Sequence, residues 1–313
     1  MLTLGMRCTV WAFAREPYRR LHDSASKDKS CERRSSVFLD ALNLCFNTRG
    51  LGWNWSQDLF VFPENRPVRS VQAFTTHVAA SAILHFILLD FLHYRVQAFS
   101  PGTFGLYNGT IFDPELPTLR RFVHAAHISW YSGVVIYSSM QAVYDLCTVV
   151  GILILRQSPQ DWPPFFWQPW KSSSLSAFWK RWHQTFREFF VGLGGYPMWL
   201  LFGRVGGVLG TFTVSGILHL VGLWGMGRGI NMWDVFGMVG FFVMMGFGIL
   251  LEGLYKRITG KRVAGWLGRI WTLIWLEVWA TFLVDAWARR GLISSQFFPD
   301  PYRPAYLVFG PLA

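Results

Sequence analysis

Two histidines lie in sequence contexts that favour chemistry. His183 ends the segment 172–183, SSSLSAFWKRWH, in which aromatic and basic side chains lie close together. His219 lies in the segment 215–220, SGILHL, inside a long apolar stretch. An ionisable side chain within a membrane helix is costly and therefore marks a candidate functional site. Histidine serves as a general base near neutral pH, and His219 could take a proton from an alcohol that attacks a thioester.

Both histidines also have a purely structural interpretation. The segment around His183 fits a helix that only anchors the chain at the membrane surface. His219 fits a buried imidazole that hydrogen-bonds a neighbouring helix. The residue pattern by itself leaves both interpretations open.

The spacing of aromatic residues predicts an amphipathic interfacial helix over residues 174–190. Its apolar face repeats at i, i+4, i+8 and i+11, with Phe178, Trp182, Phe186 and Phe189. Polar side chains cover much of the remaining surface, namely Lys180, Arg181, Gln184, Arg187 and Glu188. His183 shares a neighbouring row with Trp179 and Phe190, which places it at the edge of the apolar face.

His219 is expected to lie deeper in the membrane than His183. It follows the start of the apolar stretch 205–226 by fourteen residues, or ~21 Å along a helix. Gly216 and Gly222 reduce the bulk of the helix around it, and Ser215 is one turn away. The pattern therefore predicts a deep histidine beneath a basic, aromatic surface helix.

Composition indicates a membrane protein. The 313 residues are 52% hydrophobic and 18% aromatic, and only 15% are charged. A soluble domain usually has about 25% charged residues. The net charge of +11 comes with no nucleic-acid recognition motif. We therefore expect membrane lipid, and no nucleic acid, among the partners.

Five apolar stretches are long enough to cross a bilayer as helices. They are residues 71–94, 128–155, 205–226, 232–255 and 266–288. Short surface helices are predicted over 36–46 and near 117–126, and the apolar segment 189–202 is either re-entrant or interfacial. The predicted fold class is an all-α polytopic membrane protein with about five transmembrane helices plus an interfacial amphipathic helix.

The distribution of basic residues predicts an orientation and a division of the chain. Segments 1–70, 156–204 and 255–265 hold 21 Lys and Arg, whereas 95–127, 227–231 and 289–313 hold 7. The positive-inside rule makes the first set cytosolic. We expect a basic cytosolic region with a surface helix over 1–70, a membrane core over 71–288 with a signature at 162–220, and a short tail over 289–313.

Neither a metal site nor a resident cofactor is expected. The four cysteines form no Cys-x-x-Cys pair, and no phosphate-binding loop is present. His85 and Asp90 have the His-x4-Asp spacing of glycerolipid acyltransferases, but this spacing separates them by about 140° on a helix. The acidic residues within spans could line a cavity, pair with a cation or lie near an interface, namely Asp90, Asp145, Glu252, Glu277 and Asp285.

Around the two histidines the chain resembles the wax synthase-like branch of the membrane-bound O-acyltransferases. The resemblance rests on WPPFFW at 162–167, SLSAFWKRWH at 174–183 and SGILH at 215–219, in this order. The tract RGLGWNW at 49–55 is similar to one in fungal members. The resemblance covers roughly residues 47–288 and implies acyl transfer from acyl-CoA to a hydroxyl group.

The resemblance also implies roles for individual residues. His219 matches the family's intramembrane histidine, the expected base, and His183 matches its second polar position. The residue chemistry, and not the resemblance, gives the expected substrate-binding residues, which are Trp179 and Trp182 at the tunnel mouth, Arg181 and Lys180 near the phosphates of CoA, and Ser215. Acyl-CoA is then a co-substrate, and the second substrate is a small hydroxylated lipophilic acceptor.

Fungal relatives with the Arg-Gly tract are often acetyltransferases of secondary metabolism, which favours acetyl-CoA and a terpenoid-like acceptor. The alternatives are a long-chain wax ester or sterol ester synthase, and a non-catalytic membrane protein or transporter. The expected location is the endoplasmic reticulum. Members commonly have further spans before the Arg-Gly tract, whereas only 48 residues precede Arg49 here. We therefore expect a chain that is either naturally short or incomplete at its start.

Overall fold

The computed structural model describes residues 2–14, 16–21, 37–56, 60–99 and 109–312, and within these ranges it contains helices and no strand. Among these described residues, five segments have the length and hydropathy of a membrane-crossing helix, which confirms the predicted all-α membrane class. They are α3 (Val71–Phe99), α5 (Thr118–Leu153), Arg187–Trp224, Met232–Thr259 and α11 (Gly265–Arg289).

The other helices are short. The α-helices among them are α1 (Leu2–Ala12), α2 (Val37–Phe46), α6 (Leu175–Arg181) and α12 (Pro304–Phe309). Single 3₁₀ turns are η1 (Asn54–Ser56), η2 (Pro159–Asp161), η3 (Pro169–Lys171) and η6 (Asp300–Tyr302). The segment Met232–Thr259 combines α9 (Met232–Val235), the π-helical η5 (Phe236–Gly240) and α10 (Phe241–Thr259).

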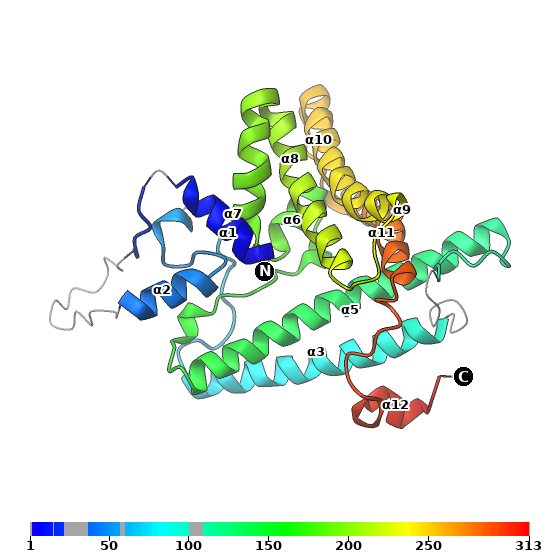
Figure 1. Cartoon of the computed structure of the whole chain (residues 1–313), viewed down its shortest axis with the longest axis horizontal. Coiled ribbons are helices and arrows are strands. Elements are labelled where there is room, and N and C mark those ends of the chain that lie inside the picture. The colour runs from blue at the N-terminus through cyan, green and yellow to red at the C-terminus, as the bar shows by residue number, and fades with distance from the viewer. Residues whose placement is uncertain (1, 15, 22–36, 57–59, 100–108, 313) are drawn as a thin grey trace.

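The segment Arg187–Trp224 is a helical hairpin (Figure 1). It comprises α7 (Arg187–Phe190), the π-helical η4 (Val191–Gly195) and α8 (Tyr196–Trp224). α8 is kinked at Phe202 and Gly203, where Gly203 has φ of 60°, a conformation that glycine adopts readily. Residues 187–202 therefore pack back along residues 204–224, which favours the re-entrant alternative for the segment 189–202 over the interfacial one.

Glycines allow the two arms of the hairpin to approach each other closely. A Cβ added to Gly194 would overlap the carbonyl oxygen of Gly210, and a Cβ added to Gly210 would overlap the carbonyl oxygen of Gly194. Small residues at a helix–helix contact in a membrane allow the backbones to pack against each other. The hairpin thus depends on these glycines on both of its arms.

The hairpin places its two ends together at one end of the bundle, which we call the foot (Figure 1). Its tip at Gly203 lies at the opposite end, near the loop between α10 and α11. Residues 156–204 were predicted to lie together on one side. That grouping is wrong, because residues up to 187 lie at the foot and Arg204 follows the tip.

Helices α3 and α5 pack side by side and run crosswise to the hairpin, beneath its foot (Figure 1). One apolar cluster lies where this pair meets α11 and includes Val96, Ile128 and Val284. A second joins α6, α8, α10 and α11 through residues such as Leu175, Leu223 and Met245. The predicted surface helix near 117–126 is the beginning of α5, because the helix continues from Thr118 without a break.

Buried ion pairs attach the end of the chain to the bundle. Arg303 donates to the carboxylate of Asp90 at 2.8 Å, and Asp90 also accepts from the backbone N–H of Ala305 at 2.7 Å. Arg290 forms a second buried pair with Asp234. The predicted tail is therefore docked onto α3 by polar groups that compensate one another's burial.

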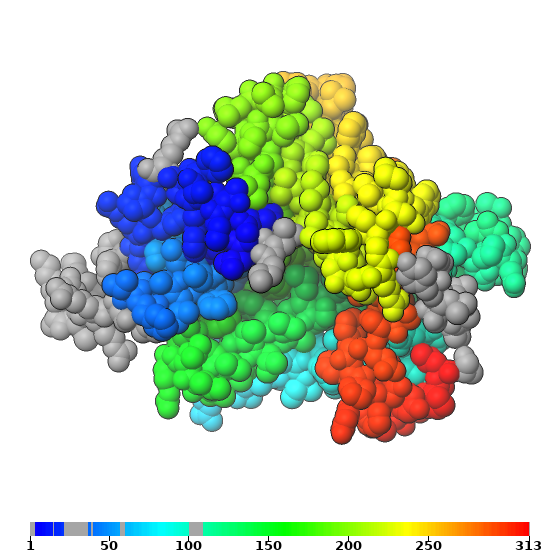
Figure 2. Space-filling model, viewed as in Figure 1, coloured from blue at the N-terminus to red at the C-terminus, as the bar shows by residue number. Residues whose placement is uncertain are grey.

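The N-terminal helices lie at the surface beside the hairpin (Figure 2). Helix α2 confirms the short helix predicted over 36–46, and its Phe38 and Leu42 side chains are exposed. Helix α1 contacts α7, and its Arg7 lies 5.9 Å from the ring of Phe189. Arg7 also donates to the carbonyl oxygens of Cys45 and Asn47, which ties α1 to the end of α2.

Candidate functional site

His183 lies in a turn and not within the long helix predicted over 174–190. Helix α6 ends at Arg181 because Trp182 adopts an extended conformation with ψ of 163°. A new helix, α7, begins at Arg187 and leads into the hairpin. The aromatic repeat of this segment therefore continues across a helix break, and the turn between α6 and α7 carries His183 at the foot of the hairpin.

Helix α6 is held at its beginning by a carboxylate from α10. Glu252 accepts from the backbone N–H groups of Leu175 at 2.6 Å and Ser176 at 3.2 Å. The side chain of Ser174 accepts from Ala177 N–H at 3.0 Å. A helix start carries unpaired N–H groups, and these acceptors satisfy three of them. Glu252 thereby fixes the position of α6 relative to α10.

Aromatic rings surround His183. The ring of Phe165 stacks on it at 5.5 Å with an interplanar angle of 8°, and Phe166 meets it edge-on at 5.9 Å. Nδ1 of His183 is buried and has no hydrogen-bond partner among the described residues. Burial, with the nearby His219 and Arg49, lowers the pKa of His183 to about 3. The imidazole is therefore neutral near pH 7.

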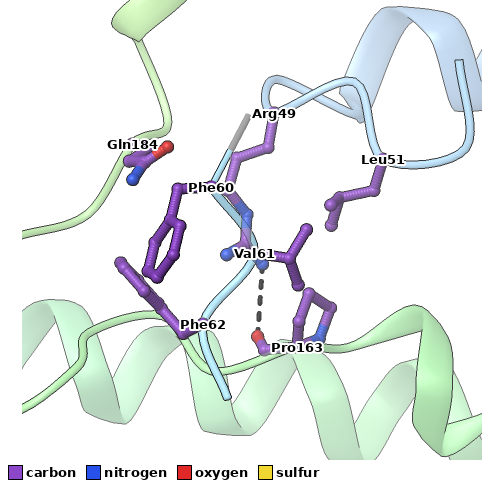
Figure 3. Close-up of a pocket in the computed structure, with 7 residues that line it drawn as sticks. All are labelled: Arg49, Leu51, Phe60, Val61, Phe62, Pro163 and Gln184. Atoms are coloured by element: carbon purple, nitrogen blue, oxygen red, sulfur yellow. Dashed lines mark hydrogen bonds between the residues drawn. The ribbon is translucent and has the colours of Figure 1, made fainter. Parts of the chain in front are cut away.

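Arg49 supports the segment that stacks on His183. Its guanidinium donates to the carbonyl oxygen of Pro163 at 3.3 Å (Figure 3). A second hydrogen bond goes to the carbonyl oxygen of Pro164 at 3.1 Å. It also donates to the hydroxyl of Tyr144 on α5 at 2.8 Å. These three bonds hold residues 163–164 next to Phe165, so Arg49 reaches His183 through one intervening ring.

His219 lies on the second arm of the hairpin, about one turn before the end of α8. Its Nδ1 lies 2.7 Å from the carbonyl oxygen of Ser215. Because a carbonyl oxygen only accepts, Nδ1 carries the proton and Nε2 keeps its lone pair in the neutral ring. The ring of Phe242 on α10 lies 4.4 Å away. This hydrogen bond to Ser215 therefore fixes the tautomer that leaves Nε2 able to accept a proton.

Close packing of η5 against α8 supports this geometry. A Cβ added to Gly216 would lie 2.8 Å from Cα of Val239, so only glycine fits without a shift of the backbone. Phe242 follows Val239 by one helical turn and therefore depends on this contact to reach His219. Gly222, by contrast, has no neighbour within 4 Å of an added Cβ.

The structure brings the two histidines together. His219 is near enough to His183 to contribute to its lowered pKa. Trp179 on α6 packs near His219, because its ring lies 6.0 Å from the ring of Phe242, which contacts His219. The predicted separation in depth assumed one continuous direction of the chain from His183 to His219, whereas the segment before α8 folds back along it.

The other predicted binding residues pack against aromatic rings. Trp182 contacts Phe166 at 4.7 Å and so belongs to the wall around His183. The guanidinium of Arg181 lies 4.5 Å from the ring of Trp167. The ammonium of Lys180 lies 3.9 Å from the ring of Phe60, and this side chain remains exposed. A role of either cation toward CoA phosphates stays a prediction.

The acidic residues within the spans have different surroundings. Asp90 and Asp285 pair with arginines, Glu252 holds α6, and Asp145 lies beside a cavity. Because Asp90 is engaged with Arg303, the His-x4-Asp spacing forms no shared site with His85. One carboxylate oxygen of Glu277 is buried without a hydrogen bond among the described residues.

Sequence reasoning missed the residues that support the histidines from a distance. Arg49 and Phe165 were part of the resemblance, but their contacts join positions more than a hundred residues apart and have no local signature. Glu252 had one available signal, a carboxylate within a membrane helix. Its partners on α6 could not be read from that signal.

Comparison with known proteins agrees with the resemblance. Residues 162–244, which contain both histidines, match the model of the membrane bound O-acyl transferase family. The chain is 24% identical to the acetyltransferase eriL of Hericium erinaceus over 253 residues, 76% of this chain and 64% of the relative. It is 32% identical to the acetyltransferase aurG of Calcarisporium arbuscula over 155 residues, 44% of this chain and 37% of the relative.

A plant relative is also similar. The probable long-chain-alcohol O-fatty-acyltransferase 8 of Arabidopsis thaliana is 29% identical over 147 residues, 44% of this chain and 43% of that protein. The matches to these three relatives thus span less than two thirds of each relative's length. No solved structure matches the chain. The family model and the relatives confirm the predicted resemblance to the membrane-bound O-acyltransferases.

Proposed function

We propose that the chain is a membrane-bound O-acyltransferase that transfers acetyl from acetyl-CoA to a hydroxyl group of a small lipophilic, terpenoid-like metabolite. The observation that carries this proposal is the pair of histidines at the foot of the hairpin. His219 has an unprotonated Nε2, and His183 is a neutral imidazole with an unpartnered nitrogen. Both lie within the segment that matches the acyltransferase family.

The pair supplies the groups that acyl transfer needs. Nε2 of His219 takes the proton of the acceptor hydroxyl while the oxygen of that hydroxyl attacks the thioester carbonyl carbon. His183 hydrogen-bonds the thioester and orients it toward that oxygen. The tetrahedral intermediate then breaks its C–S bond. The proton on His219 goes to the departing sulfur, so the products are the ester and CoA.

The binding residues are assigned on the same basis. Trp179 and Trp182 shape the mouth of the site, and Ser215 lies against the acyl group. Arg181 and Lys180 meet the CoA phosphates from the cytosol. Acetyl-CoA is supported as the donor by the acetyltransferase names of the fungal relatives. The plant relative supports a second candidate, long-chain acyl transfer to a fatty alcohol.

The location is the endoplasmic reticulum membrane, with a cytosolic N-terminus. The charge on residues 1–70 supports this orientation, because they hold 11 Lys and Arg. Acetyl-CoA reaches His183 from the cytosol in this proposal. The acceptor enters from the membrane.

A donor competition in membranes tests the function. Membranes with the wild-type chain or an equally abundant, folded His219→Ala variant receive labelled acetyl-CoA or palmitoyl-CoA with terpenoid alcohols, sterols and fatty alcohols. We expect acetyl esters that disappear with His219. Palmitoyl transfer to a fatty alcohol would replace the acetyltransferase by the second candidate. Equal acetyl transfer by the His219→Ala protein would exclude the proposed base.

A further inference from the structure

A polar cavity of about 210 Å³ lies between α3 and α5, on the far side of residues 164–168 from His183. Its volume is below the 300–1,000 Å³ of sites that enclose a whole drug-sized ligand. The cavity therefore suits one end of a larger molecule. Its polar lining includes Arg66, Ser81, His85, Tyr137, Gln141 and Asp145.

Some polar atoms of this lining are hydrogen-bonded within the protein, and others have no hydrogen-bond partner among the described residues. Asp145 is buried and accepts from Ser81 Oγ at 2.6 Å and from Gln141 Nε2 at 2.8 Å. Nδ1 of His85 donates to the carbonyl oxygen of Ser81 at 2.8 Å. Within the described parts of the chain, no hydrogen bond engages Nε2 of His85, the hydroxyl of Tyr137 or the amide oxygen of Gln141.

The open atoms suit an uncharged ligand that carries oxygen. Two of them are acceptors, and the Tyr137 hydroxyl both donates and accepts. The cation in the lining, Arg66, is already paired with Glu64 at 2.6 Å and also donates to the carbonyl oxygen of Trp162. Phosphate binding calls for arginine or lysine forks that are free to bind. The chemistry of this cavity therefore favours hydroxyl or carbonyl groups over the phosphates of CoA.

One aromatic layer separates the cavity from His183. Phe165 and Phe166 belong to the cavity wall and also contact the ring of His183, at 5.5 and 5.9 Å. Tyr137 packs on Phe166 at 4.7 Å and on His85 at 5.7 Å. The same two rings therefore border both the cavity and His183.

We infer that this cavity binds a hydroxyl or carbonyl group of the acceptor, remote from the hydroxyl that is acylated. The inference rests on the proposed function and adds a substrate class, an uncharged lipophilic acceptor with at least two oxygen atoms. His85, Tyr137 and Gln141 are the specificity-determining residues of this subsite. The donor has no contact with it.

A matched pair of acceptors tests the subsite kinetically. The pair is a sesquiterpenoid diol and the corresponding mono-alcohol that lacks the second oxygen. Tyr137→Phe keeps the ring contacts and removes the hydroxyl, and His85→Phe keeps the ring and removes the open nitrogen. We expect each to raise KM for the diol about tenfold, as the loss of one hydrogen bond does, with KM for the mono-alcohol and for acetyl-CoA unchanged.

Ser138→Ala is the control for these variants, because it removes a hydroxyl from the same helix next to Tyr137 but outside the cavity lining. It should leave the KM for the diol unchanged. An equal rise in KM for both alcohols would overturn the subsite, and so would a rise in KM for acetyl-CoA.

A binding experiment separates failure of the subsite from failure of the enzymatic proposal. The probe is the same diol carrying a diazirine, irradiated with the full chain in lipid nanodiscs. We expect labelled peptides within residues 71–90 and 137–168, in both the wild-type and the His219→Ala protein, and less label in Tyr137→Phe. Labelling without ester formation would sustain the cavity and defeat the proposed function. Ester formation with label confined to other segments would defeat the cavity alone.

Discussion

The two histidines differ in how the fold holds them. His219 sits on a regular helix, with one nitrogen bonded to Ser215 and its ring against Phe242. His183 sits in a turn between two helices, held by ring contacts, and its Nδ1 has no partner in the described structure. The hydrogen bond to Ser215 fixes the tautomer of His219, whereas Nδ1 of His183 is available to a ligand.

This difference suits the two histidines to different roles in catalysis. A base needs a defined lone pair, which the Ser215 carbonyl provides for His219. A group that binds a thioester needs a nitrogen that no protein atom already occupies, which describes His183. The supports differ in the same way, since His219 depends on backbone packing within the helical bundle and His183 on a segment fastened by Arg49. Variants that change one support at a time test this division.

After the loss of His219 itself, the largest effect is expected at His183. His183→Phe keeps the stacking on Phe165 and removes both nitrogens. We expect kcat for acetyl transfer to fall about a hundredfold, as for loss of one donor to a reacting carbonyl, with the folded protein retained. Steady-state rates with matched protein amounts measure it. A purely packing role for His183 would leave kcat near the wild-type value.

The next effect concerns the backbone contact that positions His219. Gly216→Ala pushes against Val239 and shifts Phe242, so we expect about a thirtyfold loss of kcat, because small displacements of a catalytic group are costly. Gly222→Ala, on the same helix with open space around it, is the control. Similar rates for the two alanine variants would show that the contact at Gly216 does not position the base.

A smaller effect is expected at Arg49, which supports His183 through residues 163–165. Lysine cannot reproduce the fork that bridges two carbonyl oxygens and a hydroxyl. Arg49→Lys should therefore lower kcat about tenfold, with KM for acetyl-CoA unchanged. Arg69→Lys, at an exposed position, controls for the loss of a guanidinium. If the two variants behaved alike, Arg49 would have no special part in holding the segment.

The smallest effect is on stability, and it is a pH dependence of the free energy of unfolding that comes from His183. The pKa of His183 is lowered to about 3 by burial, whereas an unfolded histidine titrates near 6.5. Below pH 6.5 the unfolded chain binds a proton that the folded chain does not, so stability falls as pH falls toward 3 and is constant above 6.5. At pH 5 the loss amounts to about 2 kcal/mol relative to pH 7.

Thermal unfolding in lipid nanodiscs at pH 7 and pH 5 measures this loss. His183→Phe removes the titrating group, so the variant should lose less stability than the wild type over the same interval. Identical losses in the two proteins would mean that His183 does not remain neutral in the folded state.

The sequence predicts those parts of the fold that depend on local pattern. Hydropathy locates the spans, and the resemblance singles out His183 and His219. The sequence left a re-entrant and an interfacial segment over 189–202 as alternatives, because Gly203 is one of 30 glycines and its positive φ has no sequence signature. The helix break after Arg181 was missed for a related reason, since aromatic spacing continued across it while tertiary contacts ended the helix.

The supports of the site are harder to predict than its histidines. Arg49 contacts Pro163 across 114 positions, and Glu252 reaches Leu175 across 77. Such contacts depend on how helices pack and leave no periodic signal in either segment. The chemistry-bearing residues were therefore accessible to sequence reasoning, and the geometry that makes them neighbours was not.

The most direct test of the central claim is a single-turnover measurement on His219→Gln in lipid nanodiscs. Labelled acetyl-CoA and an accepted alcohol are mixed with excess protein, and bound acetyl-CoA and ester are counted separately. We predict that the variant binds acetyl-CoA as the wild type does and forms ester at least a thousandfold more slowly, because glutamine keeps a polar group but offers no base. Ester formation at the wild-type rate would contradict the assignment of His219.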